Sequence, residues 1–443
     1  MDLRLCLAAA NKTLLGNRRH KFLKVKILGA AGEVGRSGFL VDADGANLLL
    51  DYGVMLGRRG TPPRYPLHVK PRDIDSVIIT HAHLDHSGGV PSLFASGSTS
   101  VYSTQPTIEL SHLLIEDMLK IEKNAHPFDI VEVNRMMRNH KKVDYRQSIS
   151  RNGATFELRE SGHVVGGSTV LVESAGKRLF YTGDINVHGT RMLREADLDI
   201  GDIDLLITES TYSQKAQTPR AESEEMLLEF ANEVIDRKGI LFVPSFSVER
   251  SQEIACVLHS RGFKHKIVMD GMALDVNDII LRHPRFLRDE HTFADVIRRS
   301  TQIKGHGQRR RALEEPCVVI SPAGMLVGGN AVFYLQRLAF DERNGIALVS
   351  YQGDGTPGRA LLDTGKVSTR GRELSVKAQV KQFEFSGHSD RNGLFDLIKK
   401  IPGSPKVVTV HGDAESCSMF AQEIQERSGL QARAGSLGEV VEA

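Results

Sequence analysis

The sequence has few cysteines, no tryptophan and no long hydrophobic run. Its 443 residues include only Cys6, Cys256, Cys317 and Cys417, and none of them forms a Cys-x-x-Cys pair. This argues against a disulfide framework and against a cysteine zinc site, and it suits the reducing cytoplasm. We expect the cysteines to be buried as small hydrophobic residues. No apolar run approaches the roughly 18 residues that a membrane span needs, so we expect no membrane partner.

The chain also lacks a strong charge of either sign. Its formal net charge is +2, so global electrostatics do not indicate a nucleic-acid binder, and any basic surface must be local. Hydrophobic residues make up 40% and charged residues 25% of the chain, which is ordinary globular usage at a length that accommodates two domains. Residues 1–23 carry a charge inside a short apolar run, and we interpret them as an extension and not a signal peptide.

The distribution of apolar residues predicts an α/β protein in which the first half and the later part follow different patterns. The first half is rich in strand-like runs, at 24–30, 38–43, 47–53 and 76–80, with a hairpin over 169–184 that turns at Ala175-Gly176. From about residue 205, strands alternate with amphipathic helices, such as the helix over 221–239, and this alternation predicts a mostly parallel sheet flanked by helices. A final segment holds a helix over 392–401, a strand over 406–410 and a closing helix over 414–429.

The stretch HAHLDH, directly after the apolar run Val77–Ile79, is the strongest chemical signal. His81 and His83 at i and i+2 can face one side of the chain, while Asp85 and His86 turn toward a neighbouring point. Imidazoles and carboxylates are suitable zinc ligands, and two such clusters could hold two ions. A polar loop after a strand is the alternative, but four ligand-type residues within six positions favour a metal site.

Other candidate ligands repeat one plan, in which a ligand-type residue stands at the end of an apolar run or in a nearby loop, close to a glycine. They are Asp51, His163, Asp184 and His411. Each alone is more simply a capping or turn residue. Together they favour a shared site, because strand ends gather at one edge of a sheet.

With these residues in order, the sequence resembles the metallo-β-lactamase superfamily, whose HxHxDH motif is matched by residues 81–86. ITESTY with Glu209, FSGHSD with His388 and VTVHGD with His411 resemble motifs A, B and C of its nucleic-acid-processing β-CASP branch. The nearest group is that of the archaeal and bacterial relatives of the cleavage and polyadenylation specificity factor nuclease. The fold implied is an αββα metallo-β-lactamase sandwich with an inserted β-CASP α/β domain.

The resemblance implies a role for each motif residue. His81, His83 and His163 would hold one zinc ion, Asp85, His86 and His411 would hold the other, and Asp184 would bridge them. Asp51 would orient a ligand histidine from behind. His388 would be the general acid and Glu209 would position it, so the catalytic residues would be Asp85, Asp184, Glu209 and His388. The implied reaction is two-metal hydrolysis of RNA phosphodiester bonds, which leaves a 3′-hydroxyl and a 5′-phosphate.

Three further stretches resemble the same branch: PSFSVERSQE (244–253), SPAGMLVGGN (321–330) and SYQGDGTPGR (350–359). They make Arg250, Ser321, Gly324, Gly328 and Gly329 candidate substrate-binding residues. The glycines could present backbone N–H groups to a phosphate at a helix start, or could be ordinary turn glycines. The six basic residues of 298–313 favour a solvated charged face, with a phosphate-tracking surface as the alternative.

We therefore predict a zinc-dependent ribonuclease with two ions per chain that acts on single-stranded RNA in the cytoplasm, with a homodimer as a candidate assembly. The predicted domains are an extension (1–23), a metallo-β-lactamase part (24–205), a β-CASP insertion (206–350) and a closing metallo-β-lactamase part (351–443). Residues 1–23 are too few for the N-terminal KH domain that some relatives carry. A thioesterase or lactonase on the same fold and a non-catalytic scaffold are the alternatives. Endonuclease against 5′→3′ exonuclease, and RNA against DNA, stay open.

Overall fold

The computed structural model describes residues 22–57, 61–97, 99–369 and 372–443. The predicted N-terminal extension therefore lies almost wholly outside the described residues, and Cys6 lies there too. Cys256, Cys317 and Cys417 are free thiols and are buried, as predicted. No helix among the described residues is both long and apolar enough to cross a membrane.

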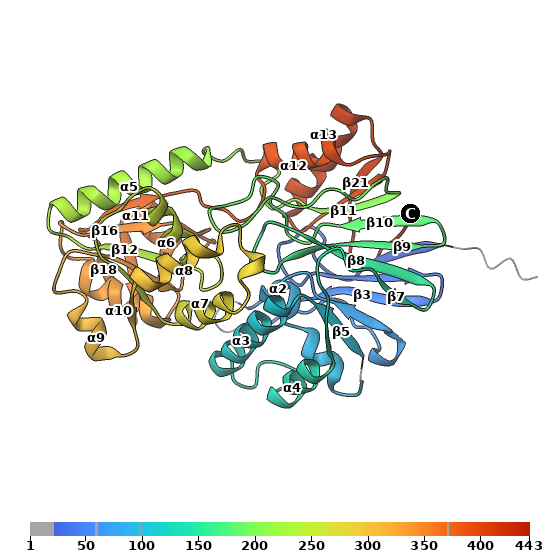
Figure 1. The fold of residues 1–443 in the computed structure, drawn as a ribbon, viewed down its shortest axis with the longest axis horizontal. Helices are drawn as coiled ribbons and strands as arrows, with labels where there is room; N and C mark the ends of the chain where they lie inside the picture. Colours follow the sequence, from blue (N-terminus) through green and yellow to red (C-terminus); the bar gives the residue numbers. More distant parts are fainter. Residues whose placement is uncertain (1–21, 58–60, 98, 370–371) are drawn as a thin grey trace, which may run out of the picture.

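Two seven-stranded sheets pack face to face and form a sandwich (Figure 1). The first sheet has the order β22 (Val440–Glu442), β1 (Leu23–Ile27), β2 (Gly38–Ala43), β3 (Ala46–Tyr52), β4 (Ser76–Ile78), β5 (Ser100–Ser103) and β6 (His140–Lys142). The second has the order β21 (Ala432–Ala434), β20 (Lys406–Val410), β11 (Leu205–Glu209), β10 (Lys177–Tyr181), β9 (Ser168–Ser174), β8 (Ala154–Glu160) and β7 (Ile149–Arg151). Apolar side chains such as Val25 and Phe39 from the first sheet meet Leu158 and Val170 from the second between them.

Helices cover both outer faces of the sandwich. On the first sheet lie α2 (Leu84–Ser87), α3 (Gln105–Ile121) and α4 (Ile130–Arg138), with the short 3-10 turns η1 (Pro71–Asp73) and η2 (Val90–Phe94). On the second sheet lie α12 (Arg391–Lys400) and α13 (Ala414–Ser428), at the upper right of Figure 1. The layers are thus αββα, which confirms the predicted fold.

A third sheet forms the left-hand lobe of Figure 1, and all of its strand pairs are parallel. Its order is β14 (Thr301–Ile303), β13 (Ile267–Asp270), β15 (Val318–Pro322), β12 (Leu241–Ser245), β16 (Gly345–Leu348) and β19 (Gln379–Gln382). One face packs on α5 (Arg220–Asp236), α6 (Arg250–Ser260), α7 (Ala273–Leu281) and α8 (Glu290–Arg299), with η3 (Pro284–Phe286). The other packs on α9 (His306–Arg311), α10 (Gly329–Leu338), α11 (Pro357–Thr364) and the ribbon of β17 (Lys366–Thr369) and β18 (Arg372–Ser375).

This lobe interrupts the sandwich in the sequence. The strand β11 precedes it and β20 follows it, yet these two strands pair in parallel inside the second sheet, with Glu209 opposite Val410. The predicted domain boundaries stay predictions, but the third sheet continues past residue 350, because β19 pairs with β16. The chain returns from the lobe close to where it left the sandwich, since Tyr212 after β11 and Asp390 before α12 form a parallel bridge.

The predicted hairpin is present as β9 and β10. Ser174 lies opposite Lys177, so the turn has two residues, and Ala175 and Gly176 both adopt positive φ (56° and 74°). Positive φ at both central residues is the geometry whose twist matches that of the flanking strands. The hairpin ends at Tyr181, whose hydroxyl donates a hydrogen bond to Asp51 of the first sheet.

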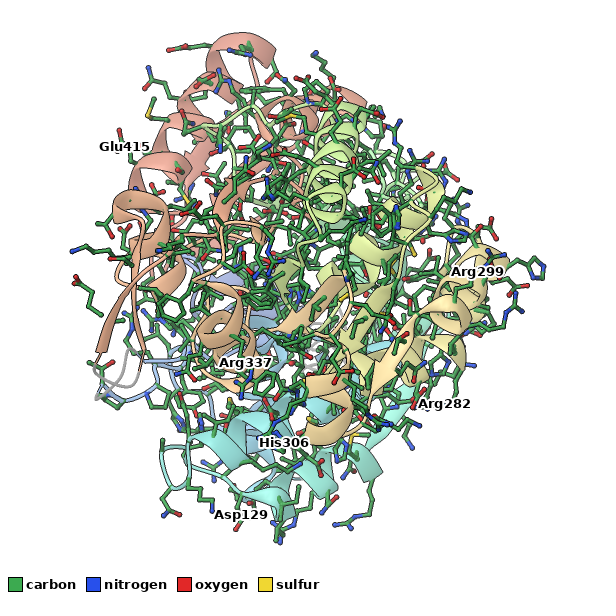
Figure 2. The ribbon with its side chains drawn as sticks, turned by 90° about the vertical axis from the view of Figure 1, so that its left-hand side faces the viewer. Asp129, Arg282, Arg299, His306, Arg337 and Glu415 are labelled. Carbon is green, nitrogen blue, oxygen red and sulfur yellow. The ribbon has the colours of Figure 1, made fainter. Side chains whose placement is uncertain are left out.

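The basic stretch 298–313 does not form one charged face. Arg298 and Arg299 are exposed and pair with Asp295, and Figure 2 shows Arg299 at the rim of the molecule. Arg309, in contrast, is buried, and its guanidinium donates to both carboxylate oxygens of Asp270 at 2.5 and 2.9 Å. The interpretation of the whole stretch as solvated charge is wrong for Arg309, because this side chain ties α9 to the end of β13.

Candidate metal centre and cleft

Four predicted ligands converge on one point at the edge of the sandwich. His83 Nδ1 lies 3.2 Å from His81 Nε2 and 3.2 Å from His163 Nε2. Asp184 Oδ2 lies 3.4 Å from the same His81 nitrogen and 3.5 Å from the same His163 nitrogen. These side chains come from the loop after β4, the loop after β8 and the loop after β10, so three strand ends build the cluster.

A second group shares Asp184 with the first. Its Oδ1 lies 3.3 Å from His86 Nε2, which is itself 3.3 Å from His411 Nε2. Asp85 Oδ2 lies 3.2 Å from His411 Nε2 and 4.0 Å from His86 Nε2. The structure thus brings all seven predicted ligands together, with one Asp184 oxygen facing each group.

These separations are those that a shared cation would set. Four ligands placed tetrahedrally at zinc distances of about 2.0–2.1 Å are about 3.3 Å apart. The first group matches this edge length on all four measured edges. The second is less regular, since His411 also points its Nδ1 at Asp184 Oδ1, at 3.4 Å. Asp184 Oδ1 is buried and has no hydrogen-bond partner among the described residues, and an unpartnered buried oxygen of this kind is consistent with a metal ligand.

Asp51 fixes one ligand from behind. It is the penultimate residue of β3, has φ +56° and is fully buried. Its Oδ2 lies 2.8 Å from His86 Nδ1 and accepts hydrogen bonds from the hydroxyls of Thr80 and Tyr181, at 2.8 and 2.9 Å. A neutral His86 held by this carboxylate would carry its proton on Nδ1 and present Nε2 to the cluster, and the orienting role of Asp51 stays a prediction.

The electrostatics of the first group suit ligation. Burial, with the neighbouring His81, lowers the pKa of His83 to about 3. Burial likewise lowers the pKa of His81 and His163. The three imidazoles are therefore neutral at physiological pH, which is the form that binds a metal.

His388 and Glu209 form a pair beside the cluster. Glu209 ends β11 and is fully buried, and its two oxygens lie 3.0 and 2.9 Å from His388 Nδ1. Its Oε1 also accepts from the backbone N–H of Ile185 at 2.7 Å. Burial lowers the pKa of His388, but Glu209 and Asp184 outweigh it and raise the pKa to about 9. These two carboxylates therefore favour the protonated form of the imidazole, which lies beside the cluster.

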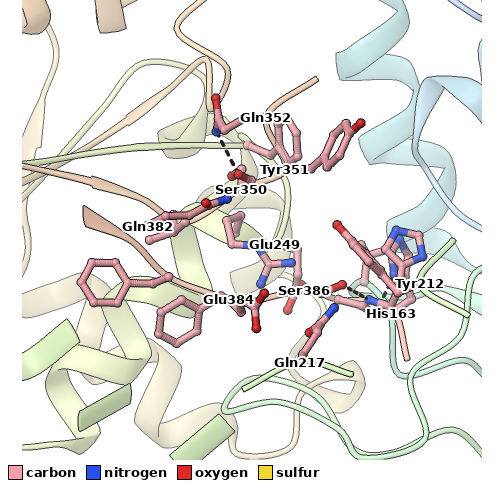
Figure 3. Close-up of a pocket in the computed structure, with 18 of the residues that line it drawn as sticks. His163, Tyr212, Gln217, Glu249, Ser350, Tyr351, Gln352, Gln382, Glu384 and Ser386 are labelled. Atoms are coloured by element: carbon pink, nitrogen blue, oxygen red, sulfur yellow. Dashed lines mark hydrogen bonds between the residues drawn. The ribbon is translucent and has the colours of Figure 1, made fainter. Parts of the chain in front are cut away.

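A cleft of about 330 Å³ opens between the sandwich and the inserted lobe (Figure 3), and His83, His163 and His388 are among the residues that line it. Figure 3 shows Ser350, Gln352 and Gln382 on one side and His163 and Tyr212 on the other. Lining residues that were not predicted singly are Tyr212, Lys215, Phe246, Glu249, Ser350, Tyr351, Gln352 and Arg359. Six of them fall in the two stretches 244–253 and 350–359 that resemble the family, so the signal lay in the stretch and not in any one residue type.

Arg250, the first residue of α6, is the predicted substrate-binding residue that the structure places in the cleft. The residue is 8% exposed, and within the described part of the chain its Nη1 has no hydrogen-bond partner. Its Nη2 would lie 3.3 Å from a Cβ built on Gly387, so the guanidinium packs beside the loop of His388. No carboxylate among the described residues forms an ion pair with it, and burial lowers its pKa to about 10. A buried, unpaired guanidinium is costly unless an anion completes the site.

The other predicted substrate-binding residues do not line the cleft. Gly328 and Gly329 stand at the start of α10 with φ of +82° and +60°. Glycine adopts positive φ readily, so the backbone conformation accounts for glycine at both positions. A Cβ on Gly324 would meet Ser350 Oγ at 2.9 Å, so Gly324 allows a close approach behind the cleft. Ser321 is the penultimate residue of β15, and its buried hydroxyl has no hydrogen-bond partner among the described residues. Their contact with substrate stays a prediction.

Comparison with known proteins decides the family. Residues 40–211 match the model of a metallo-β-lactamase superfamily domain, residues 251–361 match the β-CASP domain, and residues 373–434 match the Zn-dependent metallo-hydrolase RNA specificity domain. The chain belongs to the β-CASP branch of the metallo-β-lactamase superfamily. The resemblance inferred from the motifs is therefore confirmed.

The relatives found span most of the chain. RNase aCSPSF2 of Saccharolobus solfataricus is 34% identical over 92% of this chain and 82% of its own length. Probable RNase MJ4 of Methanocaldococcus jannaschii is 32% identical over 95% of this chain and 100% of its own. Transcription termination factor FttA of the same organism is 33% identical over 93% and 71%.

A solved structure supports the fold alone. A protein of unknown function from Enterococcus faecalis V583 superposes with a TM-score of 0.60 at 14% identity, covering 95% of this chain and 100% of that one. At this identity the likeness says nothing of activity.

Proposed function

We propose that this protein is a zinc-dependent ribonuclease that hydrolyses phosphodiester bonds of single-stranded RNA and uses two metal ions per chain. The observation that carries the proposal is the pairing of two ligand groups through Asp184, next to His388 and Glu209, in the wall of a cleft. The relatives named as ribonucleases, and the match to an RNA specificity domain, support RNA as the substrate.

The ligand set fits zinc, because it consists of imidazole nitrogens and carboxylate oxygens with tetrahedral spacing in the first group. His81, His83, His163 and Asp184 would hold one ion, and Asp85, His86, His411 and Asp184 the other. When bound, the two ions would lower the pKa of water that attacks phosphorus and offset charge on the phosphate.

His388 is the proposed general acid. Glu209 occupies its Nδ1, and among the described residues no hydrogen bond is made by its Nε2. This nitrogen is thus available to give a proton to the leaving oxygen of the RNA. Glu209 is a positioning residue, because the Ile185 amide and His388 already take its oxygens.

Arg250 is the proposed phosphate-binding residue. Its unpartnered Nη1 and its place beside the loop of His388 suit a phosphate next to the cleaved bond. A guanidinium binds phosphate through two parallel hydrogen bonds, and in this buried position the ligand would replace the missing ion pair.

Two exposed aromatic side chains favour a single-stranded substrate. Phe246 follows β12 and Tyr351 follows β16, and both line the cleft with 38% and 59% of their surface exposed. Unpaired bases can stack on such rings, whereas paired bases inside a duplex are not available to them.

The deciding experiment uses one fluorescent RNA in three forms: a linear 5′-monophosphate, a linear 5′-triphosphate and a closed circle. Each is incubated with zinc-loaded protein and with the Asp85→Ala/His86→Ala double variant. Cleavage of the circle that the variant loses indicates an endonuclease, and progressive loss of the linear monophosphate alone indicates a 5′→3′ exonuclease. Faster turnover of esters than of RNA would instead favour a thioesterase or lactonase. A protein that purifies without stoichiometric metal and cleaves nothing would be a scaffold.

A further inference from the structure

Glu249 is a strained residue in the wall of the cleft. It connects β12 to α6 with φ +69° and ψ −56°, in the positive-φ region that residues with a side chain rarely adopt. Its side chain is 2% exposed and lines the cleft. Strain of this kind persists where the surrounding fold enforces it, and it concentrates at functional sites.

Neither oxygen of this carboxyl group meets the geometry of a hydrogen bond among the described residues, although the backbone N–H of Val165 opposes the rise in pKa that burial causes. Its neighbour Glu253 shows what a structural role looks like, since that buried carboxylate accepts the N–H groups of Arg191 and Met192 at 3.0 and 3.1 Å. Burying a carboxyl group without partners is unfavourable, so a structural role does not account for Glu249. A hydrogen-bond donor that arrives with the substrate does.

The position of Glu249 limits what that donor can be. The next residue, Arg250, packs beside the loop of His388, so Glu249 stands next to the proposed phosphate site. A phosphate is repelled by a carboxylate, whereas a ribose hydroxyl adjoins each phosphate and can bond a carboxyl group in either protonation state. The 2′-hydroxyl is also the group that distinguishes RNA from DNA.

We propose that Glu249 binds the 2′-hydroxyl of a ribose next to the cleaved bond and thereby selects RNA over DNA. The inference rests on the proposed ribonuclease function and deepens it. DNA would leave the buried carboxyl group unpaired, and a site built to bond a hydroxyl rejects the analogue that lacks it.

The test uses one RNA oligonucleotide and a set in which single riboses around the cleaved bond are replaced by deoxyribose. For the wild type, one replacement should slow cleavage by about tenfold or more. In Glu249→Gly that penalty should disappear, so that RNA and the substituted oligonucleotide are cleaved alike and more slowly than RNA by the wild type. Glu249→Gln, which keeps a polar group, should retain part of the penalty.

The glycine variant also separates this role from a structural one. Glycine adopts positive φ without strain, so Glu249→Gly should melt at the same or a higher temperature than the wild type. Lys238→Gly is the matched control, because Lys238 has φ +61° and is exposed outside the cleft. It should gain similarly in melting temperature and keep the full sugar penalty.

Three results would overturn the inference: a wild type that ignores every deoxyribose replacement, a Glu249→Gly variant that keeps the penalty, or one that melts at a lower temperature. A penalty that follows the base and not the sugar would also overturn it. Binding of the same oligonucleotides, followed by fluorescence anisotropy, gives the sugar preference without cleavage. Absence of all metal-dependent cleavage with an intact sugar preference in binding would reject the ribonuclease and leave Glu249 as the sugar-reading residue.

Discussion

The carboxylate of Glu209 lies within 3.0 Å of His388 Nδ1, although the two residues are 179 positions apart. Glu209 ends the last strand before the inserted lobe, and His388 lies in the loop that returns from it. The lobe therefore both builds a wall of the cleft and delivers the proposed general acid to the metal ligands of the sandwich.

Replacement of His388 by alanine should separate catalysis from metal binding. The variant is expected to lose cleavage by on the order of 10²–10⁴-fold, because the leaving oxygen would receive no proton. Its zinc content, measured by atomic absorption, should equal that of the wild type. His259→Ala is a suitable control, since His259 pairs with Asp295 on α8, away from the cleft. Wild-type cleavage by His388→Ala would remove the general-acid assignment.

The pH profile should carry the signature of the same pair. Glu209 and Asp184 raise the pKa of His388 to about 9 against the opposing effect of burial. An acid must be protonated to act, so the cleavage rate should hold below this pH and fall as the pH rises through about 9. Glu209→Gln removes a negative charge, which lowers the pKa of His388 and moves the falling limb to lower pH. If the falling limb of the Glu209→Gln profile stayed at the wild-type pH, a group other than His388 would be responsible for it.

Asp51 should affect metal affinity without being a ligand. Asp51→Asn cannot hold the His86 ring through the same charged contact at 2.8 Å. Loss of such an orienting partner costs about 10–100-fold in metal affinity. Titration with a competing chelator would measure it, and excess zinc should restore cleavage. In His81→Ala, by comparison, both zinc content and cleavage should fall. Unchanged affinity in Asp51→Asn would contradict the orienting role.

Tyr351 should contribute to binding more than to chemistry. Tyr351→Ala is expected to weaken single-stranded RNA binding by about 1–3 kcal/mol, the usual effect of removing one stacking ring. The matched control is Phe340→Ala, because Phe340 is also an exposed aromatic residue, at 48%, but does not line the cleft. Fluorescence anisotropy would measure how tightly each variant binds a linear RNA and a hairpin RNA of equal length. Equal loss in both variants would point to a general change in stability.

The metal-site residues could be predicted from sequence because each stands in a short motif tied to a strand end. His81–His86 follow β4, Glu209 ends β11 and His411 follows β20, so local signals located them. The cleft could not be predicted in the same way. Tyr351 and Glu249 acquire meaning only from the packing of the lobe against the sandwich, and a tyrosine or glutamate after a strand carries no signal by itself.

Two other features could not be predicted from the sequence, and each has a physical reason. The helix α4 was not predicted, although Asp129 and Glu132 form a capping box at its start, because it buries only Val133 and Met136 on its short apolar face. Arg309 was grouped with exposed charge because its partner Asp270 is 39 positions away. A run of charged residues in the sequence reflects only local composition. Whether one of these side chains is buried depends on the distant residue that packs against it, as Asp270 does against Arg309.

The separation of His86 and His411 by 325 positions also bears on the order of synthesis. Domains form progressively as the chain leaves the ribosome, N-terminal parts first. Here the second ligand group and the proton donor are complete only after β20 and the loop before α12 have been made, and both of these follow the inserted lobe. A nascent chain therefore lacks a complete set of candidate metal ligands until the whole inserted lobe has been made.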